Sequence, residues 1–220
     1  MNNIVRLFLV IVFFFIIKVN ISQTHRYSIG NQYISISTPK GFVRGSTNSP
    51  DLFSFVKENE GGNMLTLELF IDKKYANDNS PDDFIPFYIK ASVIPTSCSL
   101  SQFQNEKKTI IKAFSTNLKN QTAIYERAEK IHQEFFQDNV DFLPIDEGKI
   151  IRNDSEVISL IFNSSVKEGR RIIKQTFIVS GIYMENHIFL IFVVKNDIKN
   201  YSKYIKFSND FVDSVMKANQ

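Results

Sequence analysis

The chain has 220 residues, 43% of them hydrophobic and 22% charged, which is typical of a globular protein with one domain or at most two small ones. Its formal net charge of +3 offers no broad basic face, so we expect no nucleic-acid partner. The single cysteine, Cys98, excludes an intramolecular disulfide and cysteine-based zinc or iron–sulfur sites.

The N-terminus predicts an export signal. Arg6 precedes an unbroken apolar run over residues 7–17, and polar residues follow. A helix of this run spans about 16 Å, too short for a hydrocarbon core of about 30 Å. We therefore expect residues 1–22 to be a signal peptide cleaved near Ser22, leaving residues 23–220 as a single α+β domain. The protein would then be periplasmic or secreted, with no stable membrane insertion. An uncleaved N-terminal anchor is the alternative, because no Ala-x-Ala motif is present.

Two hairpins are predicted in the first third of the chain. Segments 26–29 and 33–38 alternate apolar and polar residues around the turn Gly30-Asn31-Gln32. Segments 52–57 and 64–72 predict a second hairpin. In its second arm, Glu68 and Thr66 lie opposite an aliphatic face formed by Leu65, Leu67, Leu69 and Ile71.

Two helices are predicted in the middle of the chain. Ser80-Pro81-Asp82-Asp83 favours a helix start, and that helix should end at about Ser92. Apolar residues at three- and four-residue steps predict a longer helix over residues 101–137, with a break within residues 117–122. Its length of about 55 Å exceeds one face of such a domain.

Part of this long helix should therefore project from the domain. Its end places Phe135 and Phe136 at a loop edge, and exposed aromatic area of this kind is common in protein interfaces. We predict that Phe135 and Phe136 contact a protein partner. The alternative is that both rings pack under the sheet.

Three apolar runs between residues 157 and 195 predict the centre of the fold. Their connections are short enough for an antiparallel meander. The last run, residues 188–194, is apolar on both faces and predicts a central strand covered on both sides. Residues 200–218 predict an amphipathic helix. The expected fold class is thus α+β: an antiparallel sheet flanked by helices, with this C-terminal helix packed on the sheet.

The order of these elements resembles the Mog1/PsbP-like fold, including the exported bacterial DcrB-like proteins. Residues 33–42 (YISISTPKGF) are similar to its opening strand and the turn that follows, and residues 177–216 to its closing strand–strand–helix. The resemblance implies a domain that binds proteins or supports envelope complexes, with no catalytic residues to carry over.

Candidate residues for catalysis or metal binding are few. His25, His132 and His187 belong to no H-E-x-x-H motif, and no nucleophile or phosphate-binding motif occurs. Glu129 and His132 have the spacing of a di-iron ligand pair, but such a site needs two copies, so a surface pair is the alternative. His25 is expected in a flexible N-terminus, and residues 46–50 in a plain polar loop. We therefore expect no catalytic residues, metal or cofactor.

Three classes of function remain open. The lack of site chemistry and the resemblance favour an exported, non-catalytic protein-binding domain of the bacterial envelope, of which an immunity-type protein is one specific form. An N-terminally anchored structural envelope protein is a second class. The third is a secreted hydrolase whose site is assembled from dispersed acids, with Asp138, Asp141, Asp146 and Glu147 as candidates.

Overall fold

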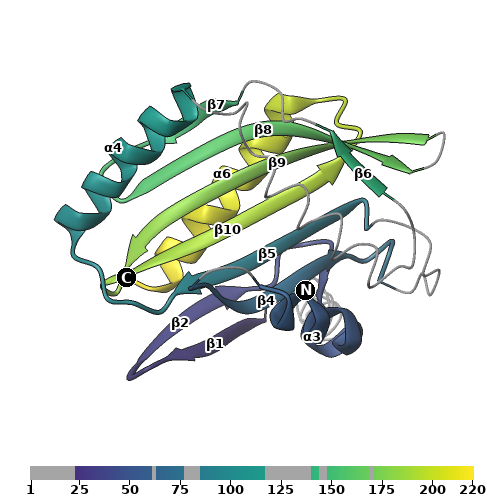
Figure 1. Ribbon diagram of the computed structural model, residues 1–220. Coiled ribbons are helices and arrows are strands. Elements are labelled where there is room, and N and C mark those ends of the chain that lie inside the picture. Colours follow the sequence, from purple (N-terminus) through teal and green to yellow (C-terminus); the bar gives the residue numbers. More distant parts are fainter. Residues whose placement is uncertain (1–22, 61–62, 77–84, 117–139, 144–147, 169–170) are drawn as a thin grey trace, which may run out of the picture.

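The computed structural model of the protein describes residues 23–60, 63–76, 85–116, 140–143, 148–168 and 171–220. Residues 1–22 lie outside them, so the predicted boundary between leader and domain stays a prediction. The centre of the fold is an antiparallel sheet of eight strands (Figure 1). In spatial order the strands are β3 (Phe42–Arg44), β4 (Leu65–Asp72), β5 (Phe87–Ile94), β10 (His187–Asn196), β9 (Arg171–Met184), β8 (Val157–Glu168) and β6 (Val140–Leu143), and β7 (Lys149–Asn153) also pairs with β8.

The meander predicted at the centre of the fold is confirmed. β8, β9 and β10 pair in sequence, and the last two are joined by a two-residue turn in which Glu185 and Asn186 both have positive φ (48° and 58°). β10 lies between β9 and β5, so it is a central strand as expected. Only one of its faces is fully buried, since Phe189 and Ile191 are inaccessible to solvent whereas Phe192 is half-buried.

Helices cover the two faces of this sheet (Figure 1). The C-terminal helix α6 (Tyr201–Ala218) packs on one face, as predicted, and its Tyr204 hydroxyl lies 3.0 Å and 2.6 Å from the carbonyl oxygens of Thr176 and Val193. On the other face, α4 (Leu100–Thr116) buries Phe103 against β8. Its later predicted portion, which includes the expected break, lies outside the described residues.

A separate two-stranded sheet forms the N-terminal hairpin and shares the core of α6. β1 (Thr24–Ile29) and β2 (Gln32–Ser37) pair as predicted, with Gly30 at φ +57° in the turn. The outer edge of β2 is closed by the end of the chain: Ser35 N donates to Asn219 Oδ1 (2.7 Å) and Asn219 Nδ2 donates to Ser35 O (2.9 Å). The side-chain amide of Asn219 thus makes the two backbone hydrogen bonds that a third strand would otherwise make.

Two predicted elements are wrong in type. Segment 52–57 is not a strand but part of helix α3 (Pro50–Glu58), which begins with Pro50 in its first turn and Asp51 near its positive end. The helix predicted over residues 80–92 is replaced by β5, which runs after Pro86 through an alternating segment flanked by two apolar strands. The start of that predicted helix lies outside the described residues.

A bulge in β4 also corrects the predicted faces of that strand. Thr66 pairs with Ser92 and Glu68 with Ala91, so Leu67 is an extra residue between two adjacent pairs. Beyond the bulge the alternation changes phase, and Glu68 joins the face that packs on α6 and the N-terminal hairpin. The carboxylate predicted to face away from the core is therefore buried within it.

Candidate functional site

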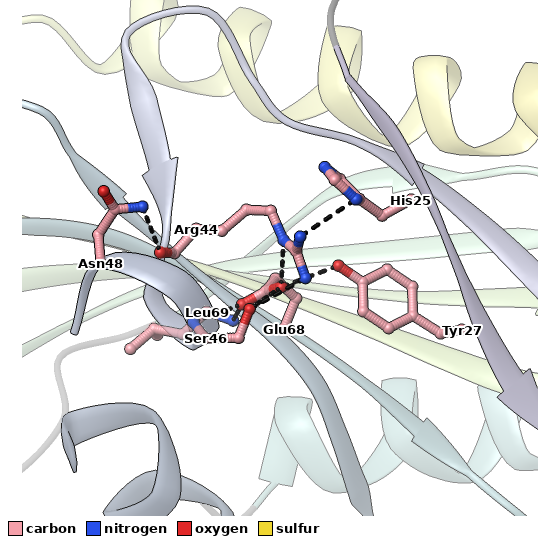
Figure 2. Close-up of polar contacts among 7 residues, drawn as sticks. All are labelled: His25, Tyr27, Arg44, Ser46, Asn48, Glu68 and Leu69. Atoms are coloured by element: carbon pink, nitrogen blue, oxygen red, sulfur yellow. Dashed lines mark hydrogen bonds and ion pairs between the residues drawn. The ribbon is translucent and has the colours of Figure 1, made fainter. Parts of the chain in front are cut away.

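The buried carboxylate of Glu68 is the centre of a polar cluster that joins three segments (Figure 2). Its Oε2 accepts hydrogen bonds from Tyr27 Oη (2.9 Å), Arg44 Nε (2.7 Å) and Ser46 Oγ (2.7 Å). Its Oε1 accepts from the backbone N–H groups of Ser46 (3.0 Å) and Leu69 (3.1 Å). Five donors thus surround a carboxylate whose side chain is 0% exposed.

The charge on Glu68 is stabilised by these donors. Burial raises the pKa of Glu68, but the hydrogen bonds from Ser46, Arg44 and Tyr27 outweigh it and hold that pKa below its ordinary value of 4.5. Burial and the same negative charge raise the pKa of the Tyr27 hydroxyl. Glu68 is therefore ionised at neutral pH with its acceptor positions occupied, which suits a structural anchor rather than an acid or base.

A short helical turn delivers two of these donors. α2 (Gly45–Asn48) follows β3 without a loop, which directs the Ser46 backbone N–H and hydroxyl at Glu68. Gly45 permits this approach, because a Cβ there would lie 2.9 Å from Leu69 Cβ and 3.0 Å from Leu69 O. The prediction of a plain polar loop over residues 46–50 is thus wrong: residues 46–48 belong to α2, Pro50 begins α3, and Ser46 is part of the cluster.

His25 is also part of this cluster instead of a flexible terminus. It lies in β1, and its Nδ1 is 3.1 Å from Arg44 Nη1, so the neutral ring accepts a hydrogen bond from the guanidinium (Figure 2). Its buried Nε2 has no hydrogen-bond partner among the described residues. Burial and the positive charge of Arg44 lower the pKa of His25 despite the opposing effect of Glu68.

An open groove of about 550 Å³ lies beside β3, and Arg44 connects it to the cluster. β3 is the last strand on this side of the described sheet, so the groove follows a sheet edge. The described residues that line it are Gln23, Thr38, Pro39, Lys40, Gly41, Phe42, Val43, Arg44, Thr47, Asn48 and Lys73. Lys40 and Lys73 are exposed, Arg44 is partly exposed, and none of these lining residues is acidic.

A second buried carboxylate, Glu60, lies on the opposite face of β4 and β5. Its Oε2 accepts from Thr66 Oγ1 (2.6 Å), and its Oε1 accepts from Ser92 Oγ (2.9 Å) and Lys90 Nζ (3.2 Å). Lys90 Nζ also lies 4.7 Å from the centre of the Phe192 ring. This cluster fastens the chain that follows α3 to the sheet.

The residues singled out from the sequence do not converge in the described part of the structure. Phe135 and Phe136 lie outside it, as do Glu129, His132 and three of the four clustered acids, so the predicted partner contact stays a prediction. His187 lies at its hairpin turn, with Nδ1 2.7 Å from Glu185 O. Within the described ranges no three His, Cys, Asp or Glu side chains are grouped as metal ligands.

The sequence did contain one overlooked sign of the cluster. Glu68 is a single acid within the apolar run Leu-Thr-Leu-Glu-Leu-Phe-Ile, and a carboxylate buried in such a strand requires partners. The nearest arginine that could reach it is Arg44. The groove lysines carried no comparable signal, because Lys40 and Lys73 belong to ordinary turns.

Comparisons with known proteins agree with the resemblance seen in the sequence. Similar solved structures include PsbP (CyanoP) from Synechocystis, with 11% identity and a TM-score of 0.39 over 91% of this chain and 94% of that one. They also include the Ran-binding protein Mog1p from Saccharomyces cerevisiae, with 9% identity and a TM-score of 0.34 over 90% and 93%. A point mutant of Mog1 matches with 8% identity and a TM-score of 0.35 over the same shares of the two chains.

These structures belong to the two families that the opening and closing segments resemble. Likeness at these TM-scores implies nothing about activity or partner. No protein-family model matches the chain, and no curated protein sequence matches it. In the part of the chain that the structure describes, no helix has both the length and the apolar character to span a membrane.

Proposed function

We propose that this protein is an exported, non-catalytic domain of the bacterial envelope that binds another protein through the groove beside β3. The observation that carries the proposal is the groove itself: an open channel along a sheet edge with Lys40, Arg44 and Lys73 in its lining. A positive patch of this kind can steer association with a partner of complementary charge and help to select it.

The chemistry beside the groove supports binding rather than catalysis. A general acid or base must exchange a proton with its substrate, which requires a reachable atom and a pKa suited to the task. The carboxylate of Glu68 is fully buried, accepts five hydrogen bonds and has a lowered pKa. His25 does not line the groove, and its Nδ1 accepts a hydrogen bond from the Arg44 guanidinium, so that atom is not free to accept a proton from a substrate.

Export rests on residues 1–22, whose apolar run is preceded by Arg6. An intact-mass measurement of the protein recovered from the envelope fraction should show loss of this leader. A mass that retains residues 1–17 would favour the anchored structural protein instead. An immunity-type role is one form of the proposal, and it predicts that the captured partner is a toxin.

Site-specific photo-crosslinking tests the binding surface. Benzoylphenylalanine replaces Asn48, which is exposed in the groove, or Asn105, which is exposed on α4 at the opposite face. We expect a discrete protein to be crosslinked in the producing cell from position 48 and not from position 105. A third variant at Phe136 tests the surface predicted from the sequence.

Two results would contradict the proposal. One is the absence of any crosslinked protein from position 48, even if a protein is captured from position 136. The other is that the purified protein turns over a substrate and loses this activity when one acidic residue is changed. That result would favour the secreted hydrolase.

A further inference from the structure

We infer that the occupant of the groove is an acidic, extended segment of the partner protein. This inference rests on the proposed function and specifies the chemistry of what is bound. Three observations support it: the positive charge in the groove, the positive charge between the groove and α6, and the concave shape of the groove.

Among the described residues that line the groove, positive charge is not balanced by any acid. Arg44 is paired with Glu68 at 2.7 Å, so its charge is largely balanced. Lys40 and Lys73 are exposed, and the described lining holds no carboxylate to balance them. The neighbouring acid, Asp72, does not line the groove, and its Oδ1 accepts a hydrogen bond from Lys74 N (3.1 Å). Two lysines therefore remain to pair with an acidic ligand.

The positive charge continues beyond the groove toward the start of α6. Burial lowers the pKa of Lys195, whose Nζ lies 4.2 Å from the centre of the Phe87 ring, and the charges of Lys74 and Lys203 lower it further. Asp72 alone opposes this effect among the groups that act on Lys195. A ligand longer than the groove would thus meet more cations, which favours a chain with several acidic side chains.

The shape of the groove favours a peptide over a lipid surface. It is concave, and exposed Thr47 and Asn48 lie in its lining beside the lysines. Such groups can form hydrogen bonds with a peptide backbone. Asn48 Oδ1 can accept one, because it is the Nδ2 atom of Asn48 that donates to Arg44 O. The lining aromatic, Phe42, is only 5% exposed and cannot insert into a bilayer.

Fluorescence anisotropy tests the inference with a labelled peptide of alternating glutamate and serine. The comparison peptide replaces glutamate with glutamine. The parent should bind the glutamate peptide, and the double variant Lys40→Glu/Lys73→Glu should bind it at least about tenfold more weakly. Raising ionic strength from about 0.01 M to about 0.15 M should also weaken binding by the parent, since the Debye length falls from about 30 Å to about 8 Å.

A matched control separates the groove from net charge. The double variant Lys108→Glu/Lys217→Glu makes the same charge change at exposed positions on α4 and at the end of α6. It should bind the glutamate peptide nearly as well as the parent. The melting temperatures of both double variants should stay within a few degrees of the parent's, because all four lysines are exposed and Lys217 contributes only the small effect of a cation at a helix end.

Four results would overturn the inference. Equal weakening by both double variants would mean a non-specific response to net charge, and equal binding of the two peptides would mean that carboxylates are not recognised. Lysine-dependent binding to phosphatidylglycerol vesicles without binding to the peptide would identify a lipid surface. If the Lys40→Glu/Lys73→Glu variant still crosslinks the same protein from position 48, the proposed function is supported, but the inference that the groove binds an acidic segment is wrong.

Discussion

Two buried carboxylates on opposite faces of the β4–β5 strand pair are satisfied in different ways. Glu68 is held by an arginine, a tyrosine, a serine and two backbone N–H groups. Glu60 is held by two hydroxyl groups and the ammonium of Lys90. Backbone donors cannot rotate away, whereas hydroxyls and lysine can find other partners. We conclude that the Glu68 cluster fixes the geometry of the groove, and the Glu60 cluster only fastens one connection to the sheet.

The largest effect should come from Glu68→Ala. This change leaves Arg44, the Tyr27 hydroxyl and two backbone N–H groups without their acceptor. Removing one partner of a buried ion pair typically costs about 3–5 kcal/mol of unfolding free energy. Urea unfolding followed by circular dichroism measures the loss. A loss below that of Glu60→Ala would reverse the ranking of the two clusters.

Glu60→Ala should have a smaller effect on the free energy of unfolding, about 1–3 kcal/mol. The Lys90 side chain is 18% exposed and can turn toward water while its stem stays near Phe192. Peptide binding at the groove should be unchanged in this variant, since Glu60 lies on the other face of the sheet. A change in that affinity would show that the two clusters are coupled.

Lowering the pH should remove part of the folding stability that Glu68 contributes. Because the pKa of Glu68 is lower in the folded protein than its ordinary 4.5, its contribution is complete above that pH and is lost as the pH falls through the folded value. Glu68→Gln should therefore be less stable than the parent at neutral pH, and the difference should narrow below pH 4.5. Melting temperatures across this range, measured for both proteins, test the sign. A constant difference would contradict it.

The smallest effect is expected at His25. Its folded pKa is lowered from 6.5, so the unfolded chain takes up a proton first as the pH falls below 6.5 and stability declines toward the folded pKa. His25→Gln should remove this slope and lose little stability at neutral pH, since the side chain is not deeply buried. If the stability of parent and variant depends on pH in the same way, His25 does not contribute to that pH dependence.

The strongly periodic segments were predictable because their pattern reflects burial alone. The alternation of apolar and polar residues over β9 and the apolar run of β10 are both typical of strands in a sheet with a buried face. The apolar stripe along α6 is typical of a helix that packs on such a sheet. Short segments were not predictable in the same way. Leu52, Phe53 and Val56 suit either period, and only the position of Pro50 and Asp51 favours the helix that forms.

The candidate site was hidden from the sequence for a different reason. The bulge at Leu67 leaves no mark in composition, yet it moves Glu68 from the predicted outer face to the core. The donors to Glu68 come from two other strands and a turn, and their convergence depends on a tertiary approach that Gly45 allows. Pattern alone therefore identified the strand and missed what its acid does.

The two hydrogen bonds between Ser35 and Asn219 also bear on the order in which the protein folds. They join residues 184 positions apart, so the edge of the N-terminal hairpin is closed by the segment that follows α6. Contacts of such long separation form late, because the intervening chain must be ordered first. The N-terminal hairpin should thus dock late in folding, after α6 has packed on the sheet.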